Sequence, residues 1–175
     1  NRLEKAEYTE TSDIVIRSLQ SMIIELEQAI QDLTRDIDDH IDGHPHLKRD
    51  RQLLESIPGV GDVVSRIMLC ILHAKGFRSA KQLAAYLGLI PRMRESGKFA
   101  GKTMITKAGP ARFRAKLYMA AVSALKYSPD ISALKKRLEA RSLKGKQIVC
   151  AAMRKLVQIC YGVVKSQTPY QAAAA

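Results

Sequence analysis

The sequence predicts an all-α protein in which a long coiled-coil helix is followed by a compact helical domain with a helix-hairpin-helix element. Two observations support this fold class. Ile and Leu alternate in a heptad pattern in the first quarter of the chain, and glycine or proline separates apolar helical stretches in the remainder. The expected organisation is a coiled-coil helix over residues 1–42, a linker over 43–50, a helical domain over 51–165 and a flexible tail over 166–175.

The 175-residue chain carries a net charge of +12 that is unevenly distributed. Residues 1–50 contain 6 Lys and Arg against 12 Asp and Glu, whereas residues 51–175 contain 23 against 5. Such a basic excess repels itself, and nucleic acid is the polyanion that most often offsets it. A membrane partner is not expected, because the basic residues are not confined to one amphipathic helix. Without a long apolar run or a signal peptide, the chain is expected to be soluble and cytoplasmic.

The first helix is predicted from seven apolar residues that are alternately three and four positions apart. Ile occupies every a position and Leu every d position, which favours a two-stranded coiled coil, a homodimer, of undetermined strand direction. Gly and Pro are absent from residues 8–42, so a helix of about 30 residues is expected. The alternative is an amphipathic helix that folds onto its own domain. The seam consists of Ile16, Leu19, Ile23, Leu26, Ile30, Leu33 and Ile37.

Gly43 and Pro45 are expected to end this helix and begin the linker. Three histidines and three aspartates gather there, so a metal site has to be weighed. We predict none, because the helix ends between the first and second histidine and a solvated turn explains the composition. The three cysteines are isolated in sequence and are expected to be buried thiols. These residues are His40, His44, His46, Asp38, Asp39, Asp42, Cys70, Cys150 and Cys160.

The stretch QLLESIPGVGDVVSRIMLCIL begins the basic part of the chain. Pro58 is expected to stop one helix, and Gly59 and Gly61 to form a tight hairpin before a second helix near Asp62. This pattern resembles a helix-hairpin-helix element, in which glycines and helix N-terminal amides approach a DNA phosphate without reading sequence. The alternative is a plain turn between two packed helices.

Further helices are expected over residues 79–87, from Pro110 to Tyr127, over 130–141 and over 145–164. Residues 92–109 are expected to form a polar loop that carries Ser96. The helix after Pro110 has a basic face that includes Arg112, Arg114 and Lys116.

Five sequence blocks make a resemblance specific. They are SIPGVG, LGLIPRMRESGK, ITKAG followed by Arg112 and Arg114, KYSPDI, and GKQIVCAAMRKL. Their order and spacing over residues 50–165 are similar to the C-terminal Tnp domain of the IS110 and IS116 group of insertion-sequence transposases. These enzymes are also known as bridge-RNA-guided recombinases, and the preceding coiled coil fits their organisation.

The resemblance implies that Ser96 is a catalytic nucleophile that attacks DNA phosphodiesters. The cations expected to bind DNA near it are Lys98, Lys102, Lys107, Arg112 and Arg114, with Gly59 and Gly61 in the hairpin. The resemblance also implies an N-terminal RuvC-like domain with a DEDD carboxylate set that holds magnesium, and a guide RNA. Neither that domain nor a cofactor is expected in these 175 residues. The chain is therefore interpreted as a C-terminal fragment that is inactive when isolated.

Two other functions remain open at this stage. The chain could be a non-catalytic DNA-binding module in which Ser96 only hydrogen-bonds a phosphate. It could also be an assembly protein whose main functional element is the coiled coil.

Overall fold

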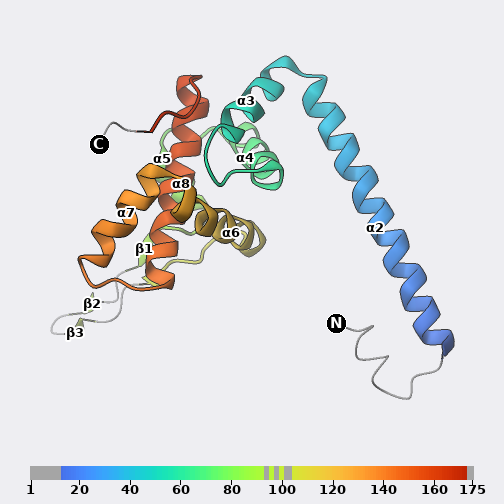
Figure 1. Ribbon diagram of the computed structural model, residues 1–175, viewed down its shortest axis with the longest axis horizontal. Helices are drawn as coiled ribbons and strands as arrows, with labels where there is room; N and C mark the ends of the chain where they lie inside the picture. The colour runs from blue at the N-terminus through green and yellow to red at the C-terminus, as the bar shows by residue number, and fades with distance from the viewer. Residues whose placement is uncertain (1–12, 93–94, 97–98, 101–103, 173–175) are drawn as a thin grey trace. The chain divides into compact units, whose positions relative to one another are not determined.

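The computed structural model in Figure 1 describes residues 13–92, 95–96, 99–100 and 104–172. These residues form seven α-helices and four strands of two residues each, so the expected all-α class is confirmed. The chain divides into two compact units, unit 1 from Asn1 to Lys48 and unit 2 from Arg49 to Ala175.

The main element of unit 1 is helix α2 (Asp13–Asp42), which runs for 30 residues as the heptad pattern predicted. Its apolar seam is largely exposed: Leu26 is 57%, Ile30 62% and Leu33 62% accessible. A seam of this kind is stable in water only when another apolar surface covers it. The pairing of α2 with a second copy stays a prediction.

Helix α2 ends just before Gly43 and Pro45, as the sequence predicted, but the residues that follow are not an irregular linker. The chain turns at Gly43, whose N–H donates to the Asp39 carbonyl at 2.9 Å, and Pro45 is the first residue of helix α3 (Pro45–Glu55). Proline suits this position because the first helical N–H has no intrahelical partner and the proline φ is already helical. Part of the stretch expected as a linker is therefore helical.

The histidines of unit 1 contact one another without forming a metal-binding group. The His40 and His44 rings are 4.4 Å apart, and His44 Nδ1 lies 2.7 Å from the His40 carbonyl oxygen. Among the residues that the structure describes, no three His, Cys, Asp or Glu side chains are arranged to hold a metal ion.

Unit 2 is built around helix α8 (Lys146–Ser166), which packs against α5 (Ala80–Tyr86), α6 (Ala111–Tyr127) and α7 (Pro129–Glu139). Figure 1 shows α8 running among these three helices. Helix α4 (Asp62–Ala74) packs on α6. The buried face of α8 consists of Ile148, Ala152, Met153, Leu156, Val157, Cys160 and Val163.

Helix α8 is long and apolar enough to span a membrane by length and composition alone. Of its most apolar window, 44% is buried inside the protein. The core helix of a soluble protein has the same properties, so this is weak evidence for a membrane segment.

The three cysteines differ in environment, and the expectation that all are buried is wrong. Cys70 is exposed on α4, Cys150 is half-buried and Cys160 is buried in the core. Burial raises the pKa of the Cys160 thiol to about 12. The neutral thiol of Cys160 is therefore a packing group.

The stretch expected as a polar loop contains two short antiparallel strand pairs. Strand β1 (Pro91–Arg92) pairs with β4 (Met104–Ile105), and β2 (Glu95–Ser96) pairs with β3 (Phe99–Ala100). The outer pair brings the two ends of the excursion together, and Ser96 lies in the inner pair.

The segment after α8, expected to be flexible, makes several hydrogen bonds in unit 2. Gln167 Nε2 donates to Asp50 Oδ1 at 2.6 Å, and the Tyr170 N–H donates to Ser56 Oγ at 2.8 Å. The Tyr170 hydroxyl donates to Asp130 Oδ2 at 2.8 Å. These bonds connect the end of the chain with α3 and α7.

Candidate functional site

The hairpin between α3 and α4 is shaped by Gly59. Its φ is +94°, and a Cβ there would lie 2.8 Å from both the Ala120 carbonyl oxygen and the Ala124 Cβ of α6. Gly61 is different, because a Cβ there would meet no atom within 4 Å. Gly59 is therefore required for close packing on α6, whereas Gly61 is the residue whose backbone faces open space.

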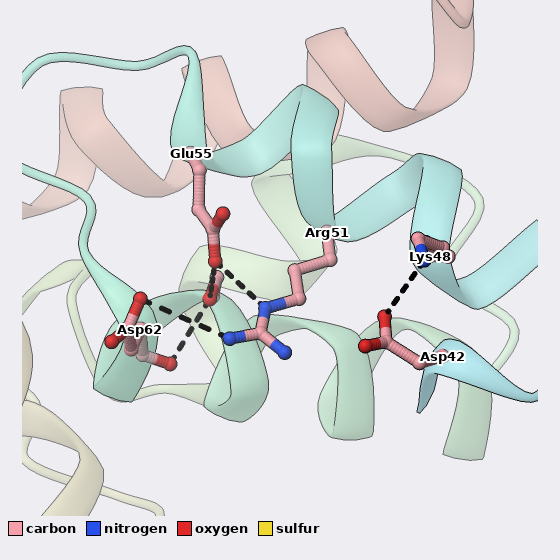
Figure 2. Close-up of polar contacts among 6 residues, drawn as sticks. Asp42, Lys48, Arg51, Glu55 and Asp62 are labelled. Atoms are coloured by element: carbon pink, nitrogen blue, oxygen red, sulfur yellow. Dashed lines mark hydrogen bonds and ion pairs between the residues drawn. The ribbon is translucent and has the colours of Figure 1, made fainter. Parts of the chain in front are cut away.

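Acidic side chains lie beside this hairpin, as Figure 2 shows. Arg51 Nε is 2.8 Å from Glu55 Oε1, and Arg51 Nη2 is 3.9 Å from Asp62 Oδ1. The buried Ser65 hydroxyl donates to Glu55 Oε1 at 3.0 Å. Asp62 lies in the first turn of α4, where its charge suits the positive end of the helix. A phosphate approaching the same helix end would meet these carboxylates, so the geometry favours the plain-turn interpretation.

The excursion that carries Ser96 is closed by a segment that we call the neck, residues 86–92 and 104–109. Gly88 and Gly109 have φ values of +69° and +100°. A Cβ on Gly88 would lie 2.0 Å from the Ala108 carbonyl oxygen, and one on Gly109 would lie 2.1 Å from the Tyr86 carbonyl oxygen. The two sides of the neck thus touch backbone to backbone, which only glycine permits.

Hydrogen bonds also cross the neck. The Thr106 N–H donates to the Ile90 carbonyl at 3.0 Å, and the Lys107 N–H donates to the Gly88 carbonyl at 3.2 Å. Lys107 adopts a left-handed φ of 55° and its side chain is exposed. A left-handed lysine is uncommon and marks a backbone held by its surroundings.

Two arginines in the first turns of α6 point in different ways. Arg112 is exposed and therefore accessible to a phosphate. Arg114 is half-buried, and its Nη1 donates to the Gly109 carbonyl at 2.8 Å and, more weakly, toward the Leu87 carbonyl at 3.4 Å. The structure therefore does not place the two expected phosphate contacts in equivalent positions.

Ser96 ends strand β2, and its Cα partner across the inner pair is Phe99. Lys98 and Lys102 lie outside the described residues. Lys107 thus lies in the neck and Arg114 bonds to it, whereas Arg112 is exposed on α6 and only Gly59 of the two hairpin glycines packs on α6.

A group of basic residues was not among the expected contacts. Six basic residues and one acidic residue lie between residues 135 and 146, at the end of α7 and in the turn before α8. The signal in the sequence was their density, which is typical of a phosphate-binding surface. All six are exposed: Lys135, Lys136, Arg137, Arg141, Lys144 and Lys146.

Most of the chain is similar in sequence to known proteins. Residues 51–136 match the model of the transposase family described as IS116/IS110/IS902. The chain is 37% identical over 130 residues to the pilin gene-inverting protein of Moraxella bovis, which covers 72% of this chain and 40% of that protein. The chain belongs to the IS116/IS110/IS902 transposase family.

Other members are more distant. The uncharacterized 43.6 kDa protein of insertion element IS110 from Streptomyces coelicolor is 24% identical over 164 residues, covering 93% of this chain and 40% of that protein. A probable family 20 transposase of Pseudomonas aeruginosa is 31% identical over 101 residues, covering 57% of this chain and 29% of that protein. The chain spans about 40% of the length of the first curated relatives that it matches.

The packing of the hairpin predicts opposite effects for its two glycines. Gly59→Ala should destabilise unit 2 by about 2–4 kcal/mol, because the methyl group meets α6 and the positive φ is unfavourable. Gly61→Ala should change stability by less than about 0.5 kcal/mol. Urea unfolding followed by circular dichroism measures both, and equal losses would contradict this assignment of Gly59.

Proposed function

We propose that this transposase-family chain binds the DNA backbone and supplies Ser96 as the nucleophile for strand exchange. The observation that supports this most directly is the neck, which holds the two ends of the Ser96-bearing excursion together. A nucleophile has to be held in register with the phosphorus atom, and a short excursion on a rigid support achieves this better than a free loop.

The chemistry proposed for Ser96 is a transesterification. Ser96 Oγ bonds to phosphorus, the bond from phosphorus to one DNA oxygen breaks, and the released strand leaves with a hydroxyl that carries the proton. The covalent intermediate keeps a phosphodiester bond, so the reverse reaction with another strand can rejoin DNA. Cations near the phosphate stabilise the negative charge of the transition state.

The exposed side chains of Lys107 in the neck and Arg112 on α6 are proposed to contact phosphate, and Lys98 and Lys102 belong to the same proposed set. The basic group over residues 135–146 extends the surface available for phosphate. Contacts of this kind position a protein on DNA without reading sequence, so sequence choice is assigned to a guide RNA.

Magnesium is expected in an N-terminal RuvC-like domain with a DEDD carboxylate set, elsewhere in the intact transposase. The acidic side chains near the hairpin do not substitute for it, because Glu55 and Asp62 are already paired with Arg51. The intact protein would act in the bacterial or archaeal cytoplasm, associated with the nucleoid. The 175-residue chain alone is proposed to bind DNA without cleaving it.

The exposed seam of α2 supports a homodimer. Replacing Ile23 and Ile30 by Lys places charges in the seam and should convert the dimer to a monomer, because desolvating them costs several kcal/mol. The matched control replaces Ile24 and Gln31 by Lys, which have the same spacing but lie outside the seam. Sedimentation equilibrium should show a dimer for the control, and a monomeric unmodified chain at tens of micromolar would contradict the proposal.

Duplex DNA should bind to the chain with little sequence preference and a steep dependence on salt. Each phosphate contact contributes about 0.9 to the slope of log affinity against log salt, so Lys107→Ala should lower the slope by about one. Arg17→Ala in α2 removes one positive charge from the acidic unit and should leave the slope unchanged. Fluorescence anisotropy with unrelated duplexes tests this, and a strong preference among them would count against it.

Ser96→Ala should abolish strand exchange in the intact transposase and leave DNA affinity within about threefold, since one hydroxyl contributes at most about one hydrogen bond. Denaturing gels should show a covalent protein–DNA adduct only when Ser96 is present. Full exchange activity of Ser96→Ala would favour the non-catalytic DNA-binding module. An adduct formed by the 175-residue chain alone would contradict the proposed need for a second domain.

A further inference from the structure

Arg112 and Arg114 are two residues apart on α6 and differ in exposure and in partners. The exposed guanidinium of Arg112 can contact phosphate, whereas Arg114 is half-buried against the neck. Because charge alone does not distinguish the two residues, the difference in their function has to come from where each guanidinium lies.

Arg114 contacts both sides of the neck. Its Nη1 donates to the carbonyl of Gly109, which follows the Ser96 excursion, at 2.8 Å. The same nitrogen is 3.4 Å from the carbonyl of Leu87, which precedes the excursion. Leu87 caps the C-terminal end of α5, where carbonyl oxygens carry partial negative charge and favour a cation. One side chain of α6 therefore joins the two points where the excursion leaves and re-enters the core.

Few other interactions join the two sides of the neck. The described part of the neck is held by the hydrogen bonds of Thr106 and Lys107, by the two-residue pairing of β1 with β4, and by the close approach of Gly88 to Ala108. A two-residue ladder is weak by itself, because isolated two-stranded pairings are marginal in water. Arg114 is the charged group among these contacts, and its bond to Gly109 is short.

We propose that Arg114 is a positioning residue that fixes the Ser96 segment on α6 through the Leu87 and Gly109 carbonyls, and that it does not bind DNA phosphate. This rests on the proposed nucleophile role of Ser96. The planar guanidinium suits the task, since it presents several N–H groups in a rigid fork. The charge of Arg114 orients the Leu87 and Gly109 carbonyl groups. In the first turn of α6, the charge that faces DNA is that of Arg112.

The experiment compares Arg114→Gln with Arg112→Gln, two substitutions that remove the same charge from the same helix. In the 175-residue chain, Arg112→Gln should lower the salt slope of DNA affinity by about one, and Arg114→Gln should leave it unchanged. Hydrogen exchange at the Thr106 and Lys107 amides should be at least tenfold faster in Arg114→Gln and unchanged in Arg112→Gln.

In the intact transposase, Arg114→Gln should lower the strand-exchange rate at saturating DNA at least tenfold without changing the DNA dissociation constant. Arg114→Lys keeps the charge and one carbonyl bond, so it should recover part of the rate and of the amide protection. Should Arg114→Gln fail to fold, Arg114→Lys carries the test through amide exchange at Thr106 and Lys107 and through the strand-exchange rate, both of which should change if Arg114 positions the neck. A salt slope lowered as in Arg112→Gln, with unchanged amide exchange, would overturn the proposal.

The Ser96 assignment can fail separately from this inference. If Ser96→Ala retains full exchange activity, the nucleophile role is lost. Faster amide exchange in Arg114→Gln at unchanged DNA affinity would then still assign Arg114 to the neck. Unchanged exchange at both amides would remove the positioning role, whatever the result for Ser96.

Discussion

The fold of unit 2 depends on backbone approaching backbone more closely than side chains ordinarily allow. Gly59 brings the α3–α4 hairpin onto the alanine surface of α6, and Gly88 and Gly109 bring the two sides of the neck together. The first contact lies on α6, which also packs against α7 and α8, and the second immediately precedes α6 in the chain. Close packing of this kind tolerates little added volume, so small residues at these positions determine where the basic surface and the Ser96 segment lie.

The helices could be predicted largely from periodicity and from glycine and proline. The heptad of α2 and the helix from Ala111 to Tyr127 follow the sequence patterns closely, because each pattern reports a local property of the backbone. The helix that begins at Pro45 was not predicted, because proline can both end one helix and begin another. The short strands were missed because two-residue pairings leave no period to detect.

The candidate site was harder to predict from the sequence than the helices were. In the sequence, a glycine that lets a phosphate approach the backbone cannot be told from a glycine that lets a helix pack against it. The residues that distinguish the two roles for Gly59 are Ala120 and Ala124, which lie some 60 positions away in the chain. The pairing of Arg51 with Glu55 could have been read from their spacing of four on a helix. The direction of the Arg114 side chain could not, because a long flexible side chain on a half-buried position has several rotamers and only the folded neck selects one.

The hydrogen bonds of Gln167 and Tyr170 give unit 2 a mechanical property. Its first helical segment, through Asp50 and Ser56, meets its last residues, so the two ends of the unit are fastened to each other at its boundary. Tension applied between those ends therefore loads these few hydrogen bonds in parallel with the hydrophobic core.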